Sequence, residues 1–175
     1  MLTRARKQED GFGLIELLMA MTMLNIGILA LVAAFQSGAV ALQRAGKLST
    51  GAAVADIQME RYRALTYGAI ALDATSAASA QEDSRYTGDS AYSSTQVTTT
   101  CTTPLAIECR ALRTLTGPDG KRYRIDTFVT FDTPVTSAAG SARQLKRVTI
   151  VVRDGLDTTR TLARIASTFD QATGS

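Results

Sequence analysis

An uncharged apolar stretch stands out near the N-terminus of the chain. From Leu17 to Leu42 it contains no charged residue and no proline. As an α-helix it would extend over about 39 Å, at about 1.5 Å per residue, whereas the hydrocarbon core of a bilayer is about 30 Å thick. The pattern therefore predicts one membrane-spanning helix. Arg4, Arg6 and Lys7 precede it. Because such positive charges tend to stay cytoplasmic, we expect the C-terminal part outside the cytoplasm.

Beyond Leu42 the helical pattern becomes amphipathic. Apolar residues recur at helical spacing, while Arg61 intrudes on their face. We expect the helix to continue to about Tyr67 and to stop at Gly68. The recurring apolar positions are Val54, Ile57 and Leu65.

The next segment, from Asp73 to Thr103, is rich in alanine, serine and threonine and has few large apolar residues. This composition fits a disordered linker, and it equally fits a long surface loop held near Cys101. The residues alone do not decide between the two.

After Pro104 the apolar residues follow a period of two, which indicates β-strands. The expected strands are 105–115, 121–131, 145–153 and 159–168, with turns at Gly117–Gly120 and Asp154–Gly155. In the strand 121–131, one face would carry Tyr123, Ile125, Val129 and Phe131. The other would carry Arg122, Arg124, Asp126 and Thr130, with Phe128 as an exception. The pattern predicts an α+β fold in which a long N-terminal helix packs on a roughly four-stranded antiparallel sheet.

Composition excludes several kinds of chemistry. The chain has no histidine, so a Ser-His-Asp triad, a Cys-His pair and histidine-ligated metals are ruled out. The net charge of +3 comes from scattered residues, which gives little support for nucleic-acid binding. Asp154 and Asp157 fit turns better than calcium ligands. We expect no catalytic residue, no cofactor and no metal.

The two cysteines, Cys101 and Cys109, are close in sequence. In a chain whose folded part is exported, such a pair is expected to form one disulfide. The alternative is a pair of free thiols in a reducing compartment. Two cysteines without other soft ligands cannot complete a zinc site.

Glu16 is the one ionisable residue within the apolar run Phe12–Leu18. A carboxylate at the edge of a membrane segment is costly and suggests a function. It could equally complement the dipole at the start of a helix. Position alone leaves these two interpretations open.

The heptapeptide from Gly11 to Leu17, GFGLIEL, resembles the class III signal of type IV pilins and type II secretion pseudopilins. The resemblance implies that a prepilin peptidase cleaves after Gly11 and methylates the new amine of Phe12. It also implies that Glu16 engages the N-terminal amine of a neighbouring subunit during assembly. Gly13 departs from the family, which more often has threonine or serine there.

The resemblance also implies the organisation and partners of the chain. Expected segments are a leader at 1–11, a transmembrane assembly helix at 12–42, an amphipathic continuation at 43–68, a Ser/Thr-rich loop at 69–103 and a sheet domain at 104–175. The fold would be pilin-like. Expected partners are the prepilin peptidase, other pilin or pseudopilin subunits, an inner-membrane assembly platform and the lipid bilayer. The protein would reside in the inner membrane before entering a pilus fibre or a periplasmic pseudopilus.

The stretch from Met23 to Leu31, followed by Gln36, is similar to PilV-type minor pilins. Three hypotheses follow: a minor pilin of a type IV pilus, a minor pseudopilin of a type II secretion system, or an ordinary anchored domain with a chance GFGLIEL motif. The Ile26-Gly27 step and the Ser/Thr-rich segment favour the pilus.

Overall fold

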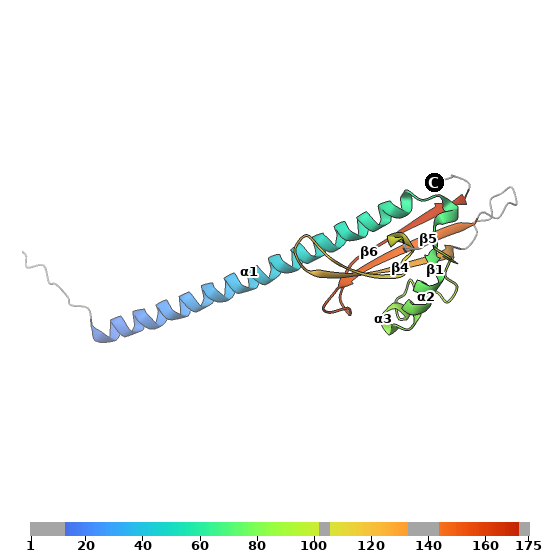
Figure 1. Cartoon of the computed structure of the whole chain (residues 1–175). Coiled ribbons are helices and arrows are strands. Elements are labelled where there is room, and N and C mark those ends of the chain that lie inside the picture. Colours follow the sequence, from blue (N-terminus) through green and yellow to red (C-terminus); the bar gives the residue numbers. More distant parts are fainter. Residues whose placement is uncertain (1–12, 102–105, 133–143, 172–175) are drawn as a thin grey trace, which may run out of the picture. The chain divides into compact units, whose positions relative to one another are not determined.

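The computed structural model describes residues 13–101, 106–132 and 144–171 (Figure 1). The chain divides into two compact units, residues 1–44 and 45–175. Helix α1, Leu14–Arg63, begins in the first unit and ends in the second. Every described residue of the first unit is exposed. Among the described residues, α1 is the one helix long and apolar enough to cross a membrane.

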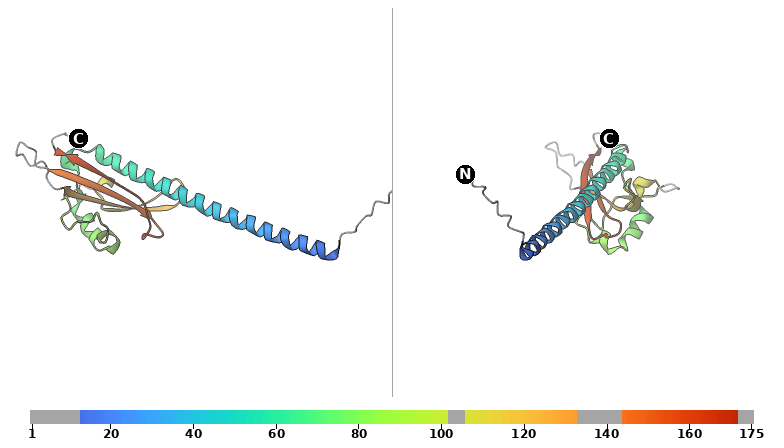
Figure 2. Two further views of the ribbon diagram at one scale, coloured as in Figure 1. Left: turned by 180° about the vertical axis from the view of Figure 1, so that it is seen from behind. Right: turned by 90° about the vertical axis from the view of Figure 1, so that its left-hand side faces the viewer.

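The second unit contains a four-stranded antiparallel sheet with the order β3-β4-β5-β6 (Figure 2). Its strands are β3 at Leu112–Thr116, β4 at Arg122–Asp132, β5 at Leu145–Asp154 and β6 at Thr161–Asp170. Each strand pairs with the next in sequence, as expected from short turns such as Gly117–Gly120. The predicted α+β fold, with a long helix and a four-stranded antiparallel sheet, is confirmed.

The C-terminal part of α1 packs on one face of this sheet. Its inward-facing residues share a hydrophobic core with alternate residues of β4 and β5. The main members are Val54, Ala55, Met59 and Tyr62 from α1, with Ile125, Val129, Val148, Ile150 and Val152 from the strands. Gly51 allows a close approach to β6, because a Cβ atom added there would lie 2.9 Å from the Leu162 Cβ atom.

The helix ends at Arg63 rather than at Tyr67. Tyr67–Ala69 instead forms a short 3-10 helix, and the chain then enters strand β1, Leu72–Asp73. Tyr62 in the last turn of α1 donates its hydroxyl to the Glu108 carbonyl in the 3-10 helix Ile107–Cys109. That 3-10 helix occupies part of the expected strand 105–115, so regular pairing begins only at Leu112.

The Ala/Ser/Thr-rich segment is structured and covers the opposite face of the sheet. It contains helices α2, Ala74–Gln81, and α3, Ser84–Thr87, and its strand β2, Thr98–Thr99, pairs in parallel with β1. Tyr86 of α3 is fully buried, and its ring stacks on Phe128 of β4 with 4.4 Å between centroids. The Tyr86 hydroxyl donates to the Thr127 carbonyl at 2.7 Å. Of the two interpretations, a disordered linker is therefore wrong for the described residues.

Because the Ala/Ser/Thr-rich segment covers the second face of the sheet, β4 does not have the expected division into one apolar and one polar face. Arg124 and Asp126, on the predicted polar face, are 7% and 0% exposed, whereas Phe131, on the predicted apolar face, is 54% exposed. Phe128 is no exception, because it is buried under Tyr86 on the same face as Arg124 and Asp126. The sheet is buried on both faces along the middle of β4.

Candidate assembly surface

The first part of α1 presents a continuous apolar surface. Large side chains remain exposed along its whole length, for example 79% for Leu14, 69% for Leu29 and 77% for Phe35. Soluble proteins rarely expose so large an apolar surface, and one of this kind marks a site that contacts lipid or protein. Other exposed residues of this surface are Leu17, Leu18, Leu24, Ile28, Leu31, Val32 and Leu42.

Two polar residues within this stretch bond to the helix itself. The Thr22 hydroxyl donates to the Met19 carbonyl at 2.8 Å, and the Ser37 hydroxyl donates to the Ala33 carbonyl at 3.1 Å. A hydroxyl satisfied within its own helix can enter an apolar environment at lower cost. Both residues are thus compatible with burial in lipid or against another helix.

Glu16 lies in the first turn of α1. Its backbone N–H donates to the Gly13 carbonyl at 3.0 Å, and its side chain is exposed. Within the described residues, no hydrogen bond or ion pair involves its carboxylate. The next charged residue along the helix is Arg44. One carboxylate therefore stands at the start of a long uncharged surface. The predicted cleavage site, Gly11 and Phe12, lies outside the described residues.

Cys101 and Cys109 form a disulfide, as predicted. The bond ties the end of the Ala/Ser/Thr-rich segment to the 3-10 helix that precedes β3. Next to it, the Cys101 N–H donates to the Asp73 carboxylate at 3.2 Å. The disulfide thus anchors the polypeptide that covers the second face of the sheet.

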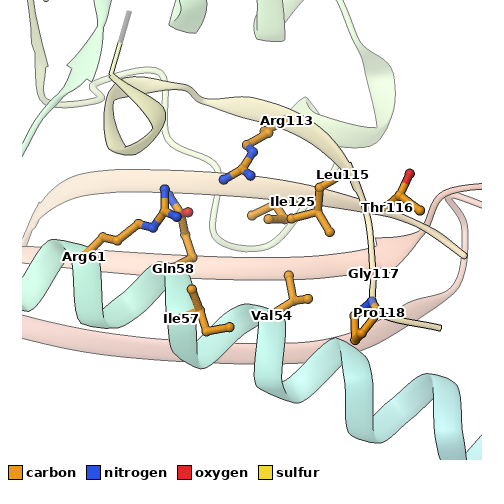
Figure 3. Close-up of a pocket in the computed structure, with 10 residues that line it drawn as sticks. All are labelled: Val54, Ile57, Gln58, Arg61, Arg113, Leu115, Thr116, Gly117, Pro118 and Ile125. Atoms are coloured by element: carbon orange, nitrogen blue, oxygen red, sulfur yellow. The ribbon is translucent and has the colours of Figure 1, made fainter. Parts of the chain in front are cut away.

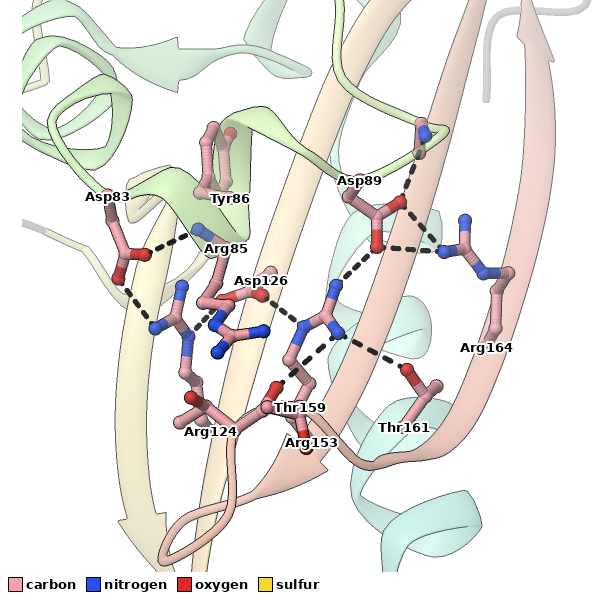
Figure 4. Close-up of polar contacts among 12 residues, drawn as sticks. Asp83, Arg85, Tyr86, Asp89, Arg124, Asp126, Arg153, Thr159, Thr161 and Arg164 are labelled. Carbon is pink, nitrogen blue, oxygen red and sulfur yellow. Dashed lines mark hydrogen bonds and ion pairs between the residues drawn. The ribbon is translucent and has the colours of Figure 1, made fainter.

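A row of alternating charges holds the same segment in place (Figure 4). Its order is Asp83, Arg124, Asp126, Arg153, Asp89 and Arg164. Arg124 binds Asp83 at 2.6 Å and Asp126 at 2.7 Å. Arg153 binds the other Asp126 oxygen at 2.8 Å and also pairs with Asp89, which accepts from Arg164 at 2.7 Å. Asp83 and Asp89, which belong to the Ala/Ser/Thr-rich segment, are thereby attached to β4, β5 and β6.

The electrostatics of this row favour the charged forms. Burial tends to raise the pKa of Asp83, but bonds from the Arg85 N–H and the Arg124 guanidinium outweigh it and hold that pKa below its ordinary value. Burial also opposes the charge of Arg124, yet Asp126 and Asp83 raise its pKa. Sequence reasoning missed this row, because its partners come from distant segments. The one local sign of such pairing was the presence of two opposite charges, Arg124 and Asp126, on the same face in the interior of a strand.

Asp154 and Asp157 act in the β5–β6 turn. Asp154 binds the Lys47 ammonium at 2.6 Å and accepts the Leu156 N–H at 3.0 Å. Asp157 accepts the Thr159 N–H at 3.2 Å. Within the residues that the structure describes, no group of three acidic or cysteine side chains is arranged to hold a metal ion.

The chain was compared with protein families, curated proteins and solved structures. No family model, no curated protein and no solved structure matches it.

Proposed function

We propose that this protein is a minor pilin, a structural subunit that is built into a type IV pilus or primes its assembly. The observation that carries the proposal is Glu16, the single carboxylate in the first turn of a helix whose following surface is apolar and exposed as far as Leu42. The GFGLIEL motif at residues 11–17 supports the same proposal, since it combines the cleavage site and the carboxylate in the expected order.

In the proposed pathway, α1 first stores the subunit in the inner membrane. The prepilin peptidase removes residues 1–11 and methylates the amine of Phe12. The subunit then leaves the lipid for a growing fibre, where apolar contacts between helices replace contacts with acyl chains. The contact residues would be Leu17, Leu18, Leu24, Ile28, Leu31 and Phe35.

Glu16 would set the axial register of neighbouring subunits. An unpaired carboxylate and an unpaired ammonium are both expensive in an apolar environment, by several kcal/mol each in real proteins. Pairing Glu16 with the N-terminal amine of the adjacent subunit offsets both costs. Because this pair forms in one relative position only, it would align one helix with the next.

The test is substitution of Glu16 in the cells that make the protein. Glu16→Ala should leave leader removal intact and strongly reduce the amount of the subunit in sheared fibres. Asp56→Ala is the matched control, because it removes an exposed carboxylate farther along the same helix. Equal incorporation of Glu16→Ala and the wild-type protein would refute the role of Glu16.

The cleavage site is tested separately with Gly11→Leu. A bulky residue at the cut position should leave the leader attached and keep the subunit in the membrane. Normal trimming of this variant would refute the assigned site.

A further inference from the structure

A narrow groove lies between α1 and strand β3 at the edge of the sheet (Figure 3). Its volume is about 170 Å³. Apolar side chains of Val54, Ile57, Leu115 and Ile125 form most of its wall, and Arg61 and Arg113 lie at one end. Ile57 is 59% exposed although it belongs to the packed part of α1. The groove thus combines an apolar wall with two guanidinium groups.

The arginine side chains at the groove form no ion pair within the described residues. In the described part of the chain, no ion pair or hydrogen bond involves the side chain of Arg61, Arg110 or Arg113. Burial lowers the pKa of Arg113, and repulsion from Arg61 and Arg110 lowers it further. By contrast, the arginines of the alternating row are all paired. An incoming carboxylate would relieve the repulsion at the groove.

Strand β3 also has a backbone edge next to the groove that pairs with no other described strand. It is the first strand of the sheet, and among the described strands it pairs only with β4. The Gly117 N–H donates to the Lys121 carbonyl and the Thr127 N–H donates to the Ala111 carbonyl, both at 2.8 Å. The backbone N–H and C=O groups of the odd-numbered residues of β3 therefore point toward β4. The N–H and C=O groups of Leu112, Thr114 and Thr116 point outward, with no partner among the described residues.

We propose that this edge binds an extended acidic segment of another protein, which joins the sheet as a fifth strand beside β3. Main-chain hydrogen bonds to Leu112, Thr114 and Thr116 would supply affinity, as in other cases of strand addition. Side chains on one face of the added strand would meet the groove. Its carboxylates would pair with Arg61 and Arg113, because guanidinium groups form strong charge-assisted bonds. Apolar side chains would contact Ile57 and Leu115.

This inference stands apart from the proposed function. An anchored domain or a pseudopilin with the same groove would bind the same kind of segment. The test therefore uses purified full-length protein in micelles of an uncharged detergent and does not require fibre assembly.

The probe is a fluorescein-labelled peptide of alternating aspartate and valine, with a lysine and valine peptide of equal length as its counterpart. Fluorescence anisotropy should show binding of the acidic peptide only. The double variant R61E/R113E should bind the acidic peptide at least about tenfold more weakly, as expected for reversing desolvated charge partners, and should gain binding of the basic peptide. That gain also shows that the variant is folded. Arg160→Glu changes an exposed arginine in the β5–β6 turn and should behave like the wild type.

Strand addition itself is tested at the backbone. Hydrogen exchange at Leu112, Thr114 and Thr116 should slow when the acidic peptide is bound. Thr114→Pro removes an outward N–H without disturbing the bonds to β4, and proline is tolerated at a sheet edge. This variant keeps both arginines and should still lose binding.

Three results would overturn the proposal. The first is failure of the wild-type protein to bind the acidic peptide. The second is equal affinity of the wild type and R61E/R113E for that peptide. The third is binding without slower exchange at the outward amides, which would indicate a simple anion site.

Discussion

The two compact units of this chain differ in the exposure of their apolar side chains. In the second unit, Tyr62, Ile150 and Phe128 are at most 1% exposed, and polypeptide covers both faces of the sheet. In the first unit, every described residue is exposed, including Leu29 and Phe35. Burial of apolar surface stabilises a protein by about 25 cal/mol per Å². The second unit obtains this stabilisation from its own core, whereas the described residues of the first unit are left exposed.

Charged residues differ between the units in the same way. In the second unit, Asp126 is completely buried and accepts bonds from two arginines. In the first unit, the Glu16 carboxylate has no partner among the described residues. The buried pair is satisfied at folding, whereas in the proposed function Glu16 would find its partner when subunits assemble. This difference separates the part of the chain that maintains the fold from the part that we propose contacts other subunits.

The largest effect on the folded unit is expected from Asp126→Ala. It leaves Arg124 and Arg153 without their shared carboxylate, and breaking a buried ion pair costs about 3–5 kcal/mol. Urea unfolding, followed by the near-UV circular dichroism of the tyrosines, should show this loss in detergent-solubilised protein. Asp56→Ala, at an exposed position, should change the free energy of unfolding by less than about 0.5 kcal/mol. Equal effects of the two variants would contradict the assigned role of the charge row.

Removal of the disulfide is expected to have the next largest effect. Cys101 and Cys109 are separated by 8 positions, and closing a loop of this size contributes about 2–3 kcal/mol in the chain-entropy account. In the double variant C101S/C109S the free energy of unfolding should fall by this amount, so that the variant unfolds at a lower urea concentration. Reductant should have no further effect on it. An unchanged midpoint in the variant would show that the bond does not stabilise the unit.

Two glycines of α1 should respond to alanine with opposite signs. At Gly51 a new Cβ atom would lie 2.9 Å from the Leu162 Cβ atom, whereas at Gly46 no atom lies within 4 Å. Gly51→Ala should therefore destabilise the second unit by about 1–3 kcal/mol through overpacking. Gly46→Ala should stabilise it by about 0.5–1 kcal/mol through helix propensity. Effects of the same sign would argue against the close packing of α1 on β6.

The smallest effect is expected from the Lys47–Asp154 pair, through pH. Burial tends to raise the pKa of Asp154, but the Lys47 hydrogen bond, two backbone N–H bonds and the Lys47 charge outweigh it and lower that pKa. Because the folded-state pKa is depressed, the contribution of Asp154 is complete above the ordinary value of about 3.9. It is lost as pH falls through the folded-state pKa.

The measurement is the unfolding midpoint between about pH 5 and pH 2, spanning the ordinary aspartate pKa, in the wild type and in Asp154→Asn. The difference between the two proteins should shrink as pH falls. A difference that does not depend on pH would contradict the assigned pKa direction.

The main elements could be predicted from the sequence because their patterns are local. The uncharged stretch 17–42 indicates a long helix, and period-two alternation indicates the strands that became β4 and β5. Turns such as Gly117–Gly120 favour pairing of neighbouring strands. These signals were sufficient for the α+β fold and for the position of Glu16 in a helix.

Burial on the second face could not be predicted in the same way. Arg124 and Asp126 have the composition of a solvent-exposed face, and their burial depends on Asp83 and on the cover provided by Tyr86, both far away in sequence. The segment that carries these residues is rich in small side chains, so it lacks the apolar period that identifies a packed helix. The groove beside β3 was missed because it requires the relative placement of α1 and an edge strand. The one local sign of the groove was Arg61, a charged residue on an otherwise apolar helix face.

The central claim, that the first unit serves subunit assembly, is tested most directly by the N-terminus of the protein in its native cells. Surface fibres would be sheared off and separated from membranes, and the N-terminal peptide of each fraction would be determined by mass spectrometry. The account predicts a methylated Phe12 terminus in the fibre fraction. A processed terminus found only in membranes would favour a pseudopilin of a secretion system. An intact terminus upstream of Gly11 in both fractions would contradict the account.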